Sequence, residues 1–219
     1  MTAMQKTTTT TKTGAALNTA TLRIAEVALS DGDKTMAQII ASNPPIVLRK
    51  VQPPFHSLVV SVINQQLSQK AAATIAGRLL DLAGGGGFLP QNIAKLSDGQ
   101  LRAAGLSASK GRFLRALTAA AQNGDLDLPK LRRLTDDEVA GRLTAIHGIG
   151  KWTAEMFMMF ALRRPDILST GDAALCRSAR IHYGKKNDKR NDAKILSDAA
   201  KRWHPWRTAA CLHLWRALR

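Results

Sequence analysis

A single carboxylate, Asp172, is the residue of this chain best suited to do chemistry. Between Arg163 and Asn187 the only other acid is Asp166, and the chain carries a net charge of +16. A carboxyl group in basic surroundings stays ionised easily. Asp172 also precedes a helical run, AALCRSARIHY, so it is equally suited to be the N-cap of that helix. The two roles are compatible, because a carboxylate fixed at a helix start can turn a free oxygen toward a reacting centre.

A glycine-containing turn before this acid predicts a helical hairpin that binds phosphate. Leu143 and Ile146 fall in the last turn of one helix, and a second helix is expected from Lys151 onward. The unpaired amide groups at the start of that second helix, with its dipole, attract phosphate without reading bases. An ordinary corner between two helices has the same glycines. The candidate phosphate contacts are His147, Gly148, Gly150, Lys151 and Thr153.

A glutamine-rich bend lies further upstream. An apolar helix from Phe55 to Asn64 gives way to Gln65, Gln66, Leu67 and Ser68, and another helix opens at Gln69 and runs toward the glycines at 84–87. For at least one of the two glutamines, capping and buried hydrogen bonding is the alternative explanation.

Several ordered motifs together resemble those of the helix-hairpin-helix DNA glycosylases. They are FHSLVVSVINQQLSQKAAATIAGRL, HGIGKWTAEMF, TGDAAL and WHPWRTAACLHLW, and the closest likeness is to the 3-methyladenine DNA glycosylase II branch. The resemblance implies an all-α fold in which two helical subdomains flank a DNA-binding cleft. We expect a central subdomain at residues 55–160, ending in the hairpin. The other would combine residues 15–54 with 161–219, after a threonine-rich, disordered tail at residues 1–14.

The resemblance also implies a reaction, in which a damaged base leaves the duplex and its N-glycosidic bond is hydrolysed. Asp172 would stabilise the positive charge that develops on the deoxyribose and orient or deprotonate the attacking water. A purine alkylated at position 3 or 7 is cationic, so an aromatic pocket attracts it. The implied pocket residues are Trp152, Met156, Ala173 and Trp215, and the implied wedge into the DNA is Gln66, with the adjacent Leu67 as a second candidate. Met156 and Ala173 replace tyrosines of well-known members, which predicts a roomier and less electron-rich pocket.

A strand-cutting lyase step is not expected. Bifunctional relatives carry a lysine just after the hairpin, where this chain has Trp152, and Lys151 lies one residue too early. Two cysteines, Cys176 and Cys211, are too few for the four-cysteine iron–sulfur cluster of those relatives, so no cofactor is expected to be required. The resemblance does imply a structural Na⁺ or K⁺ ion at the hairpin. Its ligands would be the backbone carbonyls of Thr144, Ile146 and Ile149.

Composition agrees with a DNA-binding protein. The chain has 219 residues, is 45% apolar and has a pI near 10.7. It contains no apolar run near the ~20 residues of a membrane helix, so no membrane partner is expected. Its basic surface predicts attraction to a polyanion, with affinity that falls as salt rises. We expect a monomer that binds double-stranded DNA containing damaged bases, in the nucleoid-associated cytoplasm of a bacterium or the nucleus of a eukaryote.

Two other functions are compatible with parts of the pattern. A non-catalytic helix-hairpin-helix DNA-binding module would explain the charge and the glycines but gives no reason for Asp172. A bifunctional glycosylase and lyase acting on other damaged bases would need an amine nucleophile that the sequence does not supply. Elsewhere, Lys110, Arg112 and Arg115 are expected to form a solvated helix face. Trp203 and Trp206 are expected to pack in the core.

Overall fold

All regular secondary structure in the described part of the protein, residues 16–218 of a computed structural model, is helical. The tail predicted at residues 1–14 lies outside it. The helices, in chain order, are α1 (Thr19–Gly32), α2 (Lys34–Ser42), α3 (Pro54–Asn64), α4 (Gln69–Leu82), α5 (Pro90–Lys95), α6 (Asp98–Ala103), α7 (Ala108–Gln122), η1 (Lys130–Arg133), α8 (Asp136–Thr144), α9 (Lys151–Phe160), α10 (Ala173–Tyr183), α11 (Asp192–Ala199), η2 (Ala200–Arg202) and α12 (Arg207–Arg216). This confirms the all-α prediction.

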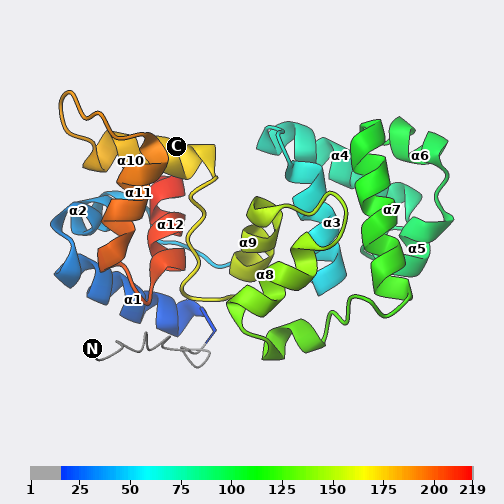
Figure 1. The fold of residues 1–219 in the computed structure, drawn as a ribbon, viewed down its shortest axis with the longest axis horizontal. Helices are drawn as coiled ribbons and strands as arrows, with labels where there is room; N and C mark the ends of the chain where they lie inside the picture. Colours follow the sequence, from blue (N-terminus) through cyan, green and yellow to red (C-terminus); the bar gives the residue numbers. More distant parts are fainter. Residues whose placement is uncertain (1–15, 219) are drawn as a thin grey trace, which may run out of the picture.

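The helices gather into two groups that lie side by side (Figure 1). One group contains α3 to α9, where α3 packs against α4, α7 and α9, and α8 packs against α9. The other contains α1, α2, α10, α11 and α12, with α12 packed against α1, α2 and α10. Segments from both ends of the chain therefore build the second group. We keep residues 55–160, and residues 15–54 with 161–219, as the proposed subdomains.

Side-chain caps begin α4 and α10, two of the helices that position the candidate site. Ser68 accepts from the amide of Ala71 at the start of α4, and Asp172 accepts from that of Leu175 at the start of α10. Each cap satisfies an amide that has no partner within its helix. The prediction that Ile146 falls in the last turn of the first hairpin helix is wrong by two residues. Helix α8 ends at Thr144, and Ile146 lies beyond it in the turn.

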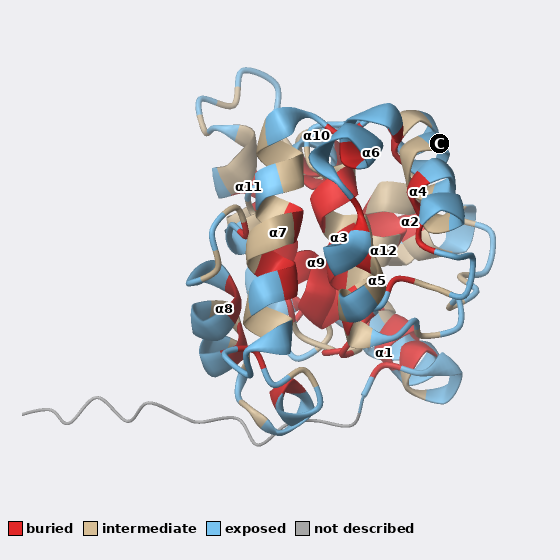
Figure 2. Ribbon diagram, turned by 90° about the vertical axis from the view of Figure 1, so that its right-hand side faces the viewer, coloured by how far each residue is buried: buried red, intermediate tan, exposed pale blue. Residues whose placement is uncertain are grey.

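The core runs through both groups, and buried faces of α3 and α9 meet in the middle of one of them (Figure 2). Leu58, Val62 and Phe157 are among its fully enclosed side chains. Trp203 is also fully buried and donates its indole N–H to Asp33, which confirms that it is a packing residue. Within residues 16–218, no helix combines the length and the apolar character needed to cross a membrane.

Candidate active site

The hairpin between α8 and α9 is held in a shape that requires glycine at position 148. Gly148 has φ +86°, a conformation that L side chains rarely adopt. A Cβ built there would lie 2.7 Å from the Cβ of Phe113 and would overlap its ring. Gly150 is the N-cap of α9 and provides no side-chain cap. The amide groups in the first turn of α9 are therefore available to a ligand such as phosphate.

The predicted phosphate contacts differ in exposure. His147, Gly150 and Lys151 are exposed, and Gly148 is half-buried. Thr153 is only 1% exposed, and its hydroxyl accepts from Nε2 of Gln65 at 3.0 Å. The group that Thr153 can offer to a phosphate is therefore its backbone amide and not its hydroxyl.

The hairpin carbonyls predicted to bind a monovalent cation have the chemistry for that role. The oxygen of Ile146 accepts from the amide of Ile149 at 3.0 Å. Among the described turn and cap bonds, the oxygens of Thr144 and Ile149 accept from no backbone amide. Carbonyl oxygens with free lone pairs suit a hard cation. The three residues therefore fit an ion, whose presence stays a prediction.

The two glutamines in the bend between α3 and α4 have different surroundings. Gln65 is half-buried, and its Nε2 donates to the backbone oxygen of Gly148 at 3.0 Å as well as to Thr153. This confirms buried hydrogen bonding for one glutamine. Gln66 is exposed and has φ +55°, and Leu67 is 39% exposed. A non-glycine residue held in this region is strained. The two predicted wedge residues thus stand at the tip of the bend.

Asp172 lies between two tryptophans that both donate to it. Nε1 of Trp152 is 2.9 Å from Oδ2, and Nε1 of Trp215 is 3.0 Å from Oδ1, which also caps α10 through the amide of Leu175 at 2.8 Å. Trp152 belongs to α9 in one helix group, whereas Asp172 and Trp215 belong to the other. Three donors fix the carboxylate, and a carboxylate has lone pairs left beyond three hydrogen bonds. The N-cap role is confirmed, and it coexists with an accessible carboxylate, since Asp172 is only partly buried.

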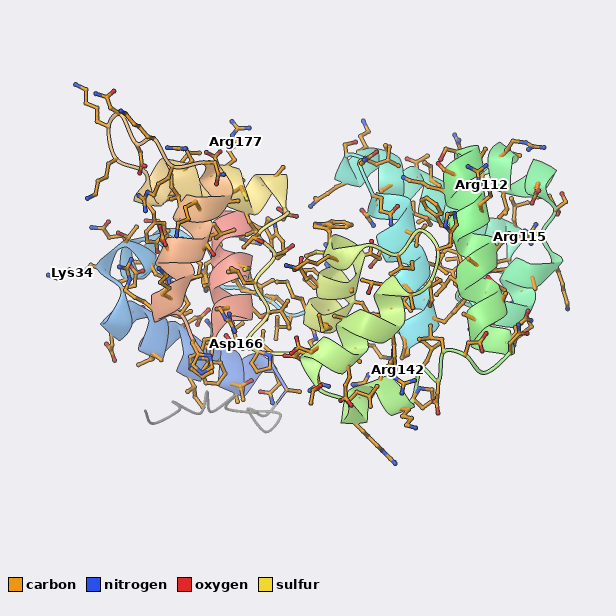
Figure 3. The ribbon with its side chains drawn as sticks, in the orientation of Figure 1. Lys34, Arg112, Arg115, Arg142, Asp166 and Arg177 are labelled. Atoms are coloured by element: carbon orange, nitrogen blue, oxygen red, sulfur yellow. The ribbon has the colours of Figure 1, made fainter. Side chains whose placement is uncertain are left out.

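The other acid of this segment is already engaged. Asp166, labelled in Figure 3, forms an ion pair with Arg207 at 2.6 Å and accepts from His204 at 2.7 Å. These bonds hold the pKa of its carboxyl below the ordinary value, against the effect of burial, which raises it. Asp166 therefore has a structural role. Of the two acids between Arg163 and Asn187, Asp172 is the one whose carboxylate has lone pairs left for a substrate or water.

An aromatic side chain that sequence analysis did not assign completes the surroundings of Asp172. Phe160 is 42% exposed, and its ring centroid lies 5.9 Å from that of Trp215. Trp152, Met156 and Phe160 follow one another at intervals of four residues on α9, and so lie along one side of the helix. Met156 is 7% exposed and Ala173 is exposed. Trp152 and Trp215 therefore supply apolar surface at the carboxylate, Phe160 extends it beside Trp215, and Met156 lies buried between Trp152 and Phe160 on α9.

A second carboxyl group, that of Glu155, lies behind this site and was missed. It is 5% exposed, and its Oε2 accepts from Oγ of Ser169 at 2.6 Å. Burial raises the pKa of Glu155, and the charge of Asp172 raises it further, whereas Ser169 and Lys151 act to lower it. Helix α9 therefore brings near Asp172 a second carboxylate from outside the segment between Arg163 and Asn187.

Glu155→Gln is expected to stabilise the protein at neutral pH. The pKa of Glu155 is raised by folding, so the buried charge destabilises the fold above the ordinary pKa of 4.5 and no longer does so at lower pH. Glutamine still accepts from Ser169 and carries no charge. Urea unfolding should give the variant a higher free energy of unfolding than the wild type at pH 7, and this difference should disappear at pH 4. A loss of stability at pH 7 would contradict this prediction.

Comparison with known protein families gives the deciding observation. Residues 59–205 match the family described as HhH-GPD superfamily base excision DNA repair protein. This range contains the bend, the hairpin and Asp172. The chain belongs to the HhH-GPD superfamily. Its all-helical structure agrees with that assignment.

Individual members of the HhH-GPD superfamily are similar over most of the chain. DNA-3-methyladenine glycosylase 1 of Schizosaccharomyces pombe is 30% identical over 197 residues, which cover 88% of this chain and 86% of that protein. The crystal structure of a Bacillus halodurans DNA-3-methyladenine glycosidase is 42% identical, with a TM-score of 0.74 and 88% of each chain covered. The S. pombe 3-methyladenine DNA glycosylase in complex with abasic DNA has a TM-score of 0.79, covering 88% of this chain and 95% of its own.

Proposed function

We propose that this chain is a monofunctional DNA glycosylase, which flips alkylated bases of the 3-methyladenine and 7-methylguanine type out of duplex DNA and excises them in base excision repair. The observation that carries the proposal is the carboxylate of Asp172, held by the indole N–H groups of Trp152 and Trp215 beside apolar surface. The similar proteins named for 3-methyladenine support the class of substrate.

The proposed reaction uses the site as follows. The hairpin amides and Lys151 hold the DNA backbone, and Gln66 or Leu67 occupies the space that the flipped base leaves. The base enters beside the rings of Trp152, Trp215 and Phe160, where cation–π attraction is worth roughly 0.5–2 kcal/mol for a cationic purine. As its bond to the sugar breaks, Asp172 stabilises the positive charge on the deoxyribose and orients a water molecule, which adds to the sugar and loses one proton to Asp172 or to solvent. The base leaves as a neutral molecule, so no general acid is needed.

The proposal of a monofunctional enzyme is supported by the surroundings of Lys151. Its Nζ lies 3.8 Å from Oε1 of Glu155, and its side chain is 78% exposed. The position that bifunctional relatives fill with lysine is Trp152, whose N–H is bonded to Asp172. We further propose that the carbonyls of Thr144, Ile146 and Ile149 hold Na⁺ or K⁺, which would add positive charge for a phosphate. The protein would act as a monomer where DNA is kept, in the cytoplasm of a bacterium or the nucleus of a eukaryote.

Release of free base from methylated duplex DNA tests the proposal. Strand breaks are scored in the same reaction before and after treatment with alkali. Base release with breaks that appear only after alkali is the expected result. Breaks without alkali would favour the bifunctional alternative. Tight DNA binding without base release from 3-methyladenine or 7-methylguanine would favour the non-catalytic module.

A further inference from the structure

A lysine on α7 holds the main chain immediately before the exposed tip of the α3–α4 bend. Nζ of Lys110 donates to the backbone oxygen of Ile63 at 2.7 Å and to that of Gln65 at 2.8 Å. Both oxygens lie at the end of α3, where carbonyls lack partners within the helix and the dipole attracts a cation. The expectation of a solvated basic face on α7 is therefore wrong for Lys110.

The other basic residues of α7 have different surroundings. Arg115 donates to the carboxylate of Asp98 at 2.9 Å and to carbonyls near α5. Arg112 is exposed, as was predicted (Figure 3). Burial lowers the pKa of Lys110, so its ammonium group has lost part of its hydration and the two carbonyls replace it. Lys110 alone among these three basic residues reaches the α3–α4 bend.

The side chain of Gln65 connects the same bend to the hairpin. While its backbone oxygen accepts from Lys110, its Nε2 donates to the backbone oxygen of Gly148 and to the hydroxyl of Thr153. One residue is thus fixed by α7 through its backbone and by the hairpin through its side chain. The next residue, Gln66, is the strained one.

Phe113 makes the third connection, from α7 to the hairpin. It lies one helical turn after Lys110, occupies the space that a side chain at Gly148 would need, and packs edge-on against His147 with ring centroids 5.2 Å apart. Helix α7 therefore contacts both the bend and the hairpin. A strained backbone persists only where its surroundings hold it, and these contacts supply such surroundings for Gln66.

The geometry points to Lys110 and Gln65 as positioning residues that fix the bend relative to the hairpin. When the hairpin binds DNA phosphate, the tip at Gln66 would then stand at a set place beside the base to be flipped. Neither residue needs to touch the reacting atoms. This inference rests on the proposed function, because it assigns the two residues to the flipping step of that reaction.

The experiment compares one lesion in two contexts. A 7-methylguanine is placed opposite cytosine in one duplex, and opposite an abasic-site analogue in the other, where flipping costs less. Single-turnover excision is measured for the wild type, Lys110→Met and Gln65→Leu. Arg112→Met is the matched control, because it removes one positive charge from the exposed face of the same helix. Thermal unfolding shows that each variant is folded at the assay temperature.

The excision rates of Lys110→Met and Gln65→Leu should fall by about tenfold or more on the duplex with the paired lesion, because the paired base costs a few kcal/mol to flip. On the duplex with the unpaired lesion the rates should fall far less. Arg112→Met should keep the wild-type ratio of the two rates. Equal losses on both duplexes would overturn the inference and indicate a general structural role. Unchanged rates on both would overturn it as well.

A 2-aminopurine beside the lesion separates this inference from the proposed function, because it brightens when its neighbour leaves the stack, without any bond being cut. The wild type should raise its fluorescence at saturating protein, and Lys110→Met should raise it much less. Should the wild type flip but not excise, the proposed function fails while the dependence on Lys110 still decides the inference. If the wild type excises and the fluorescence is indifferent to Lys110, the inference alone fails.

Discussion

Replacing Asp172 by asparagine is expected to reduce the rate of base release by about 10²–10³-fold, because electrostatic stabilisation of the transition state is usually the largest contribution that one group makes. The variant keeps the size of the side chain and removes its negative charge. Single-turnover release from methylated duplex DNA at saturating protein measures the change directly. DNA binding, followed separately with a duplex that contains an abasic-site analogue, should persist.

The substitution should leave the fold intact. Asparagine is as good an N-cap as aspartate, so its oxygen can still accept from the amide of Leu175 and from the indole of Trp215. Its NH₂ group then faces the indole N–H of Trp152, which loses its acceptor. One unsatisfied, partly buried donor costs about 1–3 kcal/mol. Denaturant unfolding should therefore show a modest loss and a single transition.

Asp33→Asn is the matched control for Asp172→Asn. Asp33 also caps a helix, α2, and also accepts from an indole N–H, that of Trp203 at 3.1 Å. It shares the structural tasks of Asp172 and lies outside the candidate site. Asp33→Asn should lower stability and leave base release by the folded protein near that of the wild type. Base release by Asp172→Asn within a few-fold of the wild type would contradict the assigned role.

The helices of the site could be predicted because their signals are local. The run after Asp172 ends at Gly184, and the observed helix is Ala173–Tyr183. The glutamine bend falls between helices that end at Asn64 and begin at Gln69, as the loss of apolar periodicity indicated. Each boundary depends on a cap or a turn residue within a few positions.

The contacts within the site were harder to predict because they join distant parts of the chain. Trp152 and Trp215 were assigned to the pocket by resemblance, but a sequence cannot tell whether an indole offers its face or its N–H edge. The exposure of Phe160, the last residue of the apolar run KWTAEMFMMF, was not predicted, because periodicity does not indicate which residue of a buried helix reaches the surface. The spacing of Trp152, Met156 and Phe160 was the available signal.

The roles of two charged residues were not predicted, because their partners are also distant in the sequence. Lys110 stands in a basic pattern typical of a solvated helix face, and only the three-dimensional fold brings the end of α3 within its reach. Glu155 follows the hairpin glycines in an otherwise apolar stretch. A buried acid in such a stretch needs a hydrogen-bond partner, but the sequence does not identify that partner. The partner, Ser169, comes from the turn that leads to Asp172.

Gly148→Ala is expected to destabilise the protein by about 2–5 kcal/mol, the sum of roughly 1–2 kcal/mol for a left-handed backbone and 1–3 kcal/mol for overpacking. The new Cβ would have to displace Phe113, which packs against His147. The hairpin would move, and affinity for duplex DNA should fall with it. Denaturant unfolding and DNA titration at fixed salt measure the two effects.

Gly141→Ala is a control with the opposite expected sign. Gly141 lies within α8, and a Cβ there meets nothing within 4 Å. Alanine in a helix interior should raise the free energy of unfolding by about 0.5–1 kcal/mol. The contrast separates the requirement at Gly148 from a general response of the hairpin region to an added methyl group.

Combining Gly148→Ala with Phe113→Ala separates the two causes. Removing the ring opens the space that the new Cβ needs, so the double variant should lose less stability than the two single losses together. The strain of φ +86° remains, because it belongs to the backbone of residue 148 and not to its neighbour. A double variant whose loss equals the sum of the single losses would show that Phe113 does not restrict this position, and the whole effect would then be backbone strain.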